Sequence, residues 1–342
     1  MEKGKGINLI IFSQYRKELM GIAILGVLFS HLVGLGGVTN PIVCILSKIM
    51  SSIAYTEGFL LLSGFGLFYS FNKRPSLYIF YKNRCLRLIV PFLIMSIPFY
   101  LYVFFEKNTD IYRFVENITA TAFWIHGNNG MWYISITIVL YILFPFLYSF
   151  MFRVIEERIV IKKTIIVLFS YFILLFLIHM LSPTYYNMVK IGINQVPMFF
   201  IGMYFGYKSM YKSRLSNSYL CAIIFMTIIL FVLKGSHEVC HAIYVVLFRT
   251  SSLLVICSLL YMFDKQNLRL PLGGVKLLGE YTLELYILHL HLYGVIITTE
   301  VFDNECFGIY KDYCEILSAI ILAIILAKPI KSITNKFSKL IL

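Results

Sequence analysis

The sequence predicts an all-α, polytopic integral membrane protein with about ten transmembrane helices and both termini in the cytoplasm. Hydrophobic residues make up 59% of the 342-residue chain and charged residues only 14%, which is too few charges for a soluble protein. Apolar runs of about 20 residues recur along the chain, and no segment shows the alternating pattern of a membrane β-barrel. Lys and Arg are concentrated in every second segment between these runs.

Ten apolar runs account for most of the chain, and each is interpreted as one helix. They lie at residues 19–38, 43–71, 86–105, 131–152, 163–181, 194–208, 218–234, 241–263, 279–301 and 313–330. The first run is not followed by a small-residue cleavage site, so we expect it to remain as a span. No linker or low-complexity segment divides the chain, which favours one membrane domain, 1–342, with short cytoplasmic tails at 1–18 and 331–342.

The positions of the positive charges predict the orientation. Of the 30 Lys and Arg residues, 23 fall in the segments on the side of the N-terminus and five in the segments on the other side. Because Lys and Arg are retained in the cytoplasm, both chain ends are predicted to lie there. The net charge of +13 does not indicate a nucleic-acid partner, since the charges form short separate clusters instead of one continuous basic face.

A histidine lies deep in the first predicted helix. His31 follows Leu19 by about 18 Å along the axis, which places it beyond the bilayer midplane toward the outside. Ionisable residues at such depth are costly and commonly functional. Gly34, Gly36 and Gly37 follow, and glycine leaves room for a ligand or a close helix contact. A neutral imidazole serves as a base, a nucleophile or a metal ligand, or it bonds to a neighbouring helix, and its position alone leaves these alternatives open.

A basic cluster lies at the predicted cytoplasmic end of the third helix, where Lys82, Arg84 and Arg87 occur close together. Arg84 and Arg87 are three residues apart, so on an α-helix they share a face. Two guanidinium groups beside an ammonium group suit a phosphate ligand. The same residues also fit a purely topogenic role, because every predicted cytoplasmic segment is basic.

Further polar and aromatic residues of the predicted helices are candidates for a supporting role. They are Glu57, Ser63, Trp132, Tyr133 and His289. Glu57 is a carboxylate at membrane depth, and Ser63 precedes a glycine that allows tight helix packing. His289 and His291 are two residues apart and so point to different helix faces, and the seven cysteines form no CxxC pair. No metal site is therefore predicted.

Five stretches resemble, in order and spacing, the motifs of acyltransferase family 3, a family of integral membrane acyltransferases. They are Arg16 to Leu25 leading to His31, Glu57 to Phe68, Arg84-x-x-Arg87 with Pro91, Met131-Trp132-Tyr133 with Tyr141 and Pro145, and Gly279 to His289. Each stretch alone is a weak match. Together they cover nearly the whole chain, and their order is specific.

The resemblance implies ten helices and the transfer of an acyl group, usually acetyl, from cytoplasmic acyl-CoA. The usual acceptor is a sugar hydroxyl of a surface polysaccharide, lipopolysaccharide, peptidoglycan or lipid-linked precursor. The first-helix histidine of the family corresponds to His31 as the catalytic residue, and its Arg-x-x-Arg pair to the acyl-CoA-binding residues, with Lys82 beside them. The family commonly has Arg or Lys where this chain has Met20, and Arg16 and Lys17 are the candidates to supply that cation.

The resemblance thus implies a multi-pass O-acetyltransferase of a bacterial cytoplasmic membrane. Its expected partners are acetyl-CoA as the donor substrate, a glycan or lipid-linked glycan acceptor and membrane lipids, with no nucleic acid and no permanently bound cofactor. His31 would act as a general base on the acceptor hydroxyl or would carry the acetyl group covalently. The alternative is a transporter or exporter with Glu57 and His31 as a proton relay. A transporter predicts helices broken by Gly or Pro at matching positions in two halves of the chain, and the sequence does not show this pattern.

Overall fold

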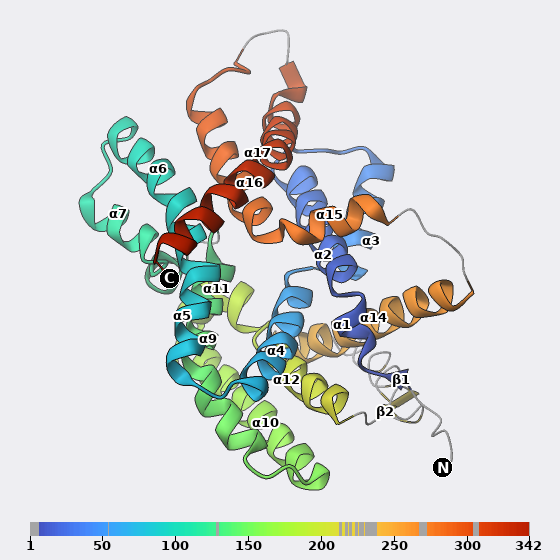
Figure 1. Cartoon of the computed structure of the whole chain (residues 1–342). Helices are drawn as coiled ribbons and strands as arrows, with labels where there is room; N and C mark the ends of the chain where they lie inside the picture. Colours follow the sequence, from blue (N-terminus) through green and yellow to red (C-terminus); the bar gives the residue numbers. More distant parts are fainter. Residues whose placement is uncertain are drawn as a thin grey trace. The chain divides into compact units, whose positions relative to one another are not determined.

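The computed structural model describes residues 7–53, 55–127, 130–211, 238–266, 272–303 and 308–341, and the separate positions 214, 215, 218, 221, 222, 225 and 229. Helices form most of this chain (Figure 1), which confirms the predicted helical fold class. The described strands are β1 (Ile7–Asn8) and β2 (Arg214–Leu215), which form one short antiparallel pair.

Seven helical stretches of the described chain are long and apolar enough to cross a membrane, and each overlaps one predicted span. They are Arg16–Gly34, Pro41–Lys73, Leu77–Glu106, Trp132–Phe152, Glu157–Leu181, His241–Lys265 and Lys311–Leu340. Two further predicted spans coincide with shorter helices, α12 (Pro197–Met210) and α16 (Thr282–Thr298). The predicted span at 218–234 lies largely outside the described residues. A multi-pass membrane protein is confirmed, whereas the count of ten spans and the side of the termini stay predictions.

The chain divides into two compact units. Unit 1 comprises Met1–Leu19, Thr56–Leu77 and Ile136–Leu272, and unit 2 comprises Met20–Tyr55, Tyr78–Ser135 and Gly273–Leu342. The helices α2 (Arg16–Gly34) and α9 (Trp132–Phe152) contribute residues to both units. The single membrane domain expected from the sequence stays a prediction.

Two glycines bring the helices of unit 1 into backbone contact. A Cβ atom on Gly64 of α4 (Thr56–Lys73) would lie 2.2 Å from the carbonyl oxygen of Phe199 on α12, and one on Gly202 would lie 2.0 Å from that of Leu61. Only glycine fits at either position, as expected where membrane helices pack through small residues. The remaining helices of unit 1 are α1 (Ile11–Gln14), α10 (Glu157–Leu181), α11 (Pro183–Ile193) and α14 (Glu238–Lys265).

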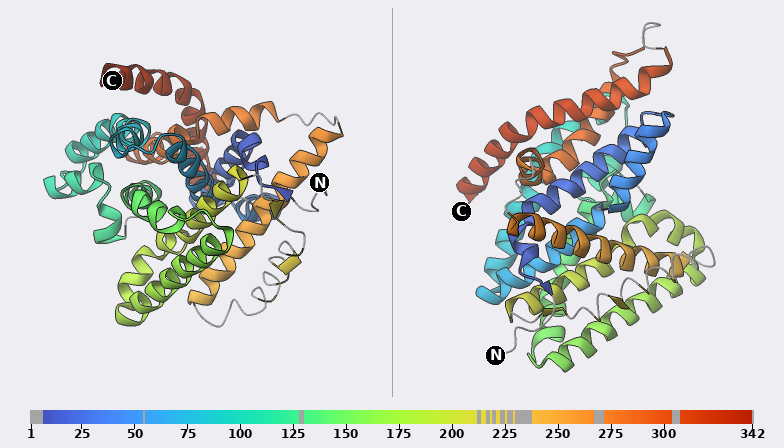
Figure 2. Two further views of the ribbon diagram at one scale, coloured as in Figure 1. Left: turned by 60° about the horizontal axis from the view of Figure 1, so that its bottom comes forward. Right: turned by 90° about the vertical axis from the view of Figure 1, so that its right-hand side faces the viewer.

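Unit 2 contains α16 and the long α17 (Lys311–Ile341), which run side by side (Figure 2). Lys331 of α17 donates a hydrogen bond to the carbonyl of Glu280, and its ammonium lies 4.9 Å from the ring centroid of Tyr281. The helix continues past this anchor, so the predicted tail at 331–342 is helical over its described residues. The other elements of unit 2 are α3 (Pro41–Ile53), α5 (Leu77–Arg84), the π-helical turn η1 (Cys85–Ile89), α6 (Val90–Glu106), α7 (Ile111–Ile118), α8 (Ala122–His126), α15 (Gly273–Glu280) and η2 (Gly308–Tyr310).

The prediction of one helix at 43–71 is corrected by the structure, which has two helices there, α3 and α4. One helix of 33 residues from Pro41 to Lys73 would be about 50 Å long, against about 30 Å for the hydrocarbon core of a bilayer. The second helix begins at Thr56, whose buried hydroxyl donates to Gln195 Oε1 at 2.8 Å.

Candidate active site

His31 of α2 and His289 of α16 form a hydrogen-bonded pair inside unit 2. His31 Nδ1 lies 2.8 Å from His289 Nε2, and the two rings stack with centroids 5.0 Å apart. His289 is completely buried, and its other nitrogen, Nδ1, lies 2.7 Å from the carbonyl oxygen of Leu285. The sequence indicates both histidines as candidates but does not pair them, since 258 positions separate them along the chain.

The partners in this chain of hydrogen bonds determine where the protons are. A carbonyl oxygen only accepts, so His289 Nδ1 carries a proton and donates it to Leu285. A buried ring that makes no ion pair among the described residues is neutral, because a lone buried charge is costly. His289 Nε2 is therefore unprotonated and accepts from His31 Nδ1. The neutral His31 then has a free lone pair on Nε2, which is the form that a general base or a nucleophile requires.

Tyr286 connects this pair with the start of α9. It lies three residues before His289 and so shares its helix face. Its hydroxyl donates to the carbonyl of Gly130 at 3.3 Å, and its ring centroid lies 5.4 Å from Tyr133 and 6.3 Å from His289. The buried Trp132 is the neighbour of Tyr133. Tyr286 was not predicted, although its place one turn before His289 was a usable sequence signal.

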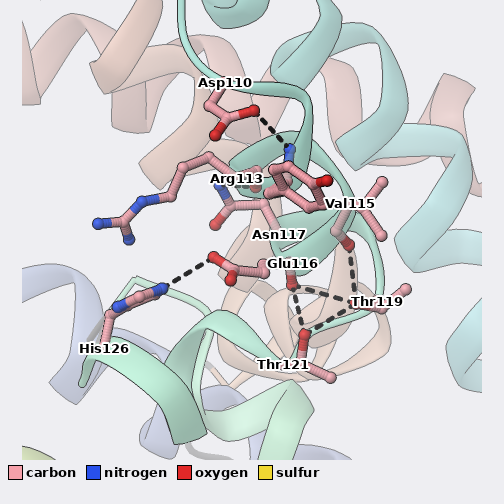
Figure 3. Close-up of polar contacts among 9 residues, drawn as sticks. Asp110, Arg113, Val115, Glu116, Asn117, Thr119, Thr121 and His126 are labelled. Atoms are coloured by element: carbon pink, nitrogen blue, oxygen red, sulfur yellow. Dashed lines mark hydrogen bonds and ion pairs between the residues drawn. The ribbon is translucent and has the colours of Figure 1, made fainter.

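The helices that precede α9 make polar contacts of their own. His126 Nε2 of α8 lies 2.9 Å from Glu116 Oε2 of α7 (Figure 3). The hydroxyl of Ser135 donates to the carbonyl of Ala120 at 2.6 Å, which ties the first turn of α9 to the residues between α7 and α8. Trp132 lies in the same first turn of α9 as Ser135.

The glycines after His31 have different surroundings. A Cβ atom on Gly34, three residues further along α2, would meet no atom within 4 Å. A Cβ atom on Gly36 would lie 2.9 Å from Ile316 Cγ2 and 3.2 Å from Tyr313 Cα on α17. The close helix contact expected for this stretch is thus present at Gly36, whereas room for a ligand beside His31 stays a prediction.

His291 has a packing role that is separate from the pair. Its Nε2 lies 2.9 Å from Ser96 Oγ, and its ring stacks on Phe99 with centroids 4.2 Å apart. The different environments of His289 and His291 agree with their two-residue spacing on a helix. Within the described ranges, no group of His, Cys, Asp and Glu side chains is arranged as a metal site.

The three cations predicted to bind phosphate lie where α5 passes into the π-helical turn η1. Lys82 and Arg84 are on α5 and Arg87 is in η1. A π-turn is wider than an α-turn, so Arg84 and Arg87 are spread further around the axis than their α-helical spacing predicts. Arg84 is half-buried, with its guanidinium 5.8 Å from the ring centroid of Phe80, whereas Arg87 is exposed. Such π-turns are frequent at functional sites.

Pro91 explains this turn. A proline clashes with the carbonyl four residues before it and has no N–H, so it disfavours a regular α-helix in the turn before it. In η1 the N–H of Val90 bonds to the carbonyl of Cys85, and the next bond of that pattern, from Pro91 to Leu86, has no donor. The hydroxyl of Ser338 on α17 donates to the Leu86 carbonyl instead, at 3.4 Å. The C-terminal part of α17 thus supports the basic segment.

Two supporting candidates lie on α4 in unit 1. Glu57 is buried, with Oε1 3.6 Å from Arg249 Nε of α14. Ser63 Oγ lies 3.4 Å from the hydroxyl oxygen of Tyr141 on α9. The structure thus gives Ser63 a helix-packing environment and Glu57 a charged partner that sequence reasoning did not identify. Arg249 is detectable in the sequence as a cation within a predicted span.

Arg16 and Lys17 open α2, about 22 Å before His31 along the same helix. The guanidinium of Arg16 lies against α4 in unit 1, where a Cβ atom on Gly66 would be 2.6 Å from its Nη1 atom. Arg16 and Lys17 thus lie in the first turn of α2, and a supporting role for either stays a prediction.

The comparisons with known proteins give one match. A family model described as an acyltransferase domain, that of acyltransferase family 3, matches residues 19–329, which is nearly the whole chain. No curated protein and no solved structure matches the chain significantly. The matched range includes both histidines of the pair and the three cations near η1.

Proposed function

The chain belongs to acyltransferase family 3 and is a membrane acyltransferase, and from this premise we propose that it transfers acetyl groups from cytoplasmic acetyl-CoA to glycan hydroxyls. The acceptor in this proposal is a surface polysaccharide or a lipid-linked glycan, and the location is a bacterial cytoplasmic membrane. The observation that supports the chemistry is the hydrogen-bonded pair of His31 and His289, which leaves a lone pair on His31 Nε2.

In the first route His31 is a general base. Its Nε2 accepts the proton of the acceptor hydroxyl while the hydroxyl oxygen attacks the thioester carbonyl of acetyl-CoA. The C–S bond then breaks, and the thiolate of CoA takes up the proton from Nε2. The products are the acetyl ester and CoA, and His31 returns to its starting form with Nδ1 still bonded to His289.

In the second route His31 is a nucleophile. Its Nε2 attacks the thioester carbonyl, the C–S bond breaks, and the acetyl group is held on the ring as CoA leaves as a thiolate. The acceptor hydroxyl then attacks the acetyl carbonyl, its proton passes to the thiolate, and Nε2 leaves as the neutral imidazole nitrogen. Both routes begin from the same lone pair, so the geometry of the pair supports each of them.

Lys82, Arg84 and Arg87 are the proposed site for the phosphate groups of CoA. Guanidinium groups bind phosphate oxygens through paired hydrogen bonds, and the ammonium adds a third positive charge. The exposed Arg87 and the half-buried Arg84 offer donors at different depths of the same segment. In this proposal the pantetheine arm of the donor passes from this segment between the helices of unit 2 toward His31.

The proposal is tested by following radiolabel from acetyl-CoA into glycan in membranes that contain the protein or its His31→Ala variant. We expect transfer with the wild type and none above background with the variant, at equal amounts of folded protein. Full transfer by His31→Ala would remove the histidine from the mechanism. No transfer by the wild type to any envelope glycan would remove the proposed acceptor class.

A further inference from the structure

In unit 1, Glu57 and Arg249 form a buried pair of opposite charges that are not hydrogen-bonded to each other. Glu57 is 3% exposed, and the side chain of Arg249 is 14% exposed. Their closest atoms, Glu57 Oε1 and Arg249 Nε, are 3.6 Å apart, which is too long for a hydrogen bond. Glu57 Oε2 and the Nε and Nη1 atoms of Arg249 are buried and have no hydrogen-bond partner among the described residues.

A pair that served packing alone would have a different form. Arg and a carboxylate in an apolar environment normally close to about 2.7–2.9 Å with two parallel bonds, because unsatisfied buried charges are strongly unfavourable. Here two N–H donors and one carboxylate oxygen remain unused next to each other. A third group that bonds to both side chains would satisfy all three atoms.

The charges of the pair limit the chemistry of that third group. An anion would be repelled by Glu57 and a cation by Arg249. A hydroxyl group is neutral and both donates and accepts, so neighbouring hydroxyls of a sugar match the unused donors and acceptor. The ring centroid of Phe248 lies 5.9 Å from Arg249 Cζ, and the Phe248 ring stacks with that of Tyr244. The two rings supply apolar surface, which ligand sites commonly combine with a few polar groups.

The place of the pair also fits a ligand from outside the cell. Glu57 is the second residue of α4, directly after Thr56, whose hydroxyl bonds to Gln195 just before α12. Arg249 lies eight residues into the apolar span that starts at His241, about 12 Å along the axis. The charge distribution predicts that α4, α12 and this span all begin at the outer face.

We propose that Glu57 and Arg249 bind neutral sugar hydroxyls of the glycan acceptor. Glu57 Oε2 accepts a hydrogen bond from one hydroxyl, and Arg249 Nε and Nη1 donate to the oxygen of the same hydroxyl or its neighbour. The inference rests on the proposed function, in which the acceptor is a glycan, and it adds the class of acceptor, a neutral sugar, and two residues that hold it.

The test measures binding without acetyl-CoA. Purified full-chain protein is examined by saturation-transfer NMR with the methyl glycosides of glucose, galactose, mannose, rhamnose and N-acetylglucosamine. We expect at least one to bind the wild type, and Glu57→Gln or Arg249→Lys to weaken it at least about tenfold, as for one lost hydrogen bond to a charged group.

Two further variants separate binding from folding. The double variant Glu57→Leu with Arg249→Met replaces the ion pair by apolar side chains, which buried sites commonly tolerate, so we expect folded protein that binds no glycoside. Glu238→Gln removes the exposed ion pair of Lys190 with Glu238, 3.2 Å apart in the same unit, and should leave glycoside binding unchanged.

Three outcomes would overturn the inference: no glycoside binds the wild type, only anionic glycosides such as a glucuronide bind, or the folded double variant binds as well as the wild type. Acetyl transfer is measured separately. Protein that binds glycosides through Glu57 and Arg249 but transfers no acetyl group would refute the proposed function and leave this site standing. Active protein that fails the binding test would refute the site alone.

Discussion

Replacement of His289 by leucine should slow acyl transfer through its effect on His31. Leucine fills a similar volume but cannot accept the hydrogen bond from His31 Nδ1, which is 2.8 Å long. The neutral His31 ring is then free to carry its proton on Nε2, and in that tautomer Nε2 is neither a base nor a nucleophile. His289→Gln is the matched variant, because its side-chain carbonyl oxygen reaches about as far as the lost Nε2 and accepts the same bond.

The size of the effect follows from the lost contact. A buried polar group left without its partner costs about 1–3 kcal/mol. At about 1.36 kcal/mol for each factor of ten in rate, kcat of His289→Leu should fall about 5- to 150-fold. We expect His289→Gln to stay within about tenfold of the wild type by the same conversion. The KM for acetyl-CoA should not change in either variant, because the proposed phosphate-binding residues are intact.

The assay is the initial rate of acetyl transfer by reconstituted protein over a range of acetyl-CoA concentrations, with His31→Ala as the baseline. Wild-type kcat in His289→Leu would show that His289 does not set the tautomer of His31. Equal losses of kcat in the leucine and glutamine variants would refute the hydrogen-bond argument in favour of a packing role. A rise in KM with unchanged kcat would move His289 to donor binding.

Three more predictions test other parts of the chain. Arg84→Lys should weaken acetyl-CoA binding about tenfold in titrations of purified protein, because lysine lacks the paired donors; an unchanged affinity would leave Arg84 a topogenic role. Gly202→Ala should destabilise the protein by about 1–3 kcal/mol in thermal unfolding, since the added Cβ would overlap a carbonyl oxygen of α4. The control Gly273→Ala should leave the stability nearly unchanged, because its added Cβ would meet no atom within 4 Å. In a cysteine-free background, an impermeant thiol reagent outside intact cells should label Tyr112→Cys, where the native side chain is 73% exposed, and not Lys82→Cys; the opposite pattern would invert the topology.

The spans and the individual candidate residues could be predicted because each depends on local sequence. An apolar run is recognisable from its composition, and the spans found by length and apolarity all overlap predicted ones. His31 and His289 were recognisable because an ionisable side chain is unusual at membrane depth. The pairing of the two histidines could not be predicted, since it depends on the register between α2 and α16, which only tertiary packing sets.

The local backbone was less predictable than the spans. Pro91 indicates an interruption, but a kink, a broken helix and a π-turn are all compatible with the sequence. In the structure the freed carbonyl of Leu86 meets Ser338, a residue near the far end of the chain. The pairing of Glu57 with Arg249 could not be predicted either, because the sequence shows two charged residues in separate spans and not the distance between them.

The pairing of His31 with His289 also has a consequence for biosynthesis. The ribosome makes His31 258 residues before its partner, so at about 5–20 residues per second the two are separated by roughly 13 to 50 seconds. During that interval the nascent chain already has its first histidine in place but nothing that holds the ring in one tautomer. In the proposed mechanism, His31 is fixed in its reactive tautomer only near the end of translation, and a chain that stops before His289 lacks the hydrogen bond that selects this tautomer.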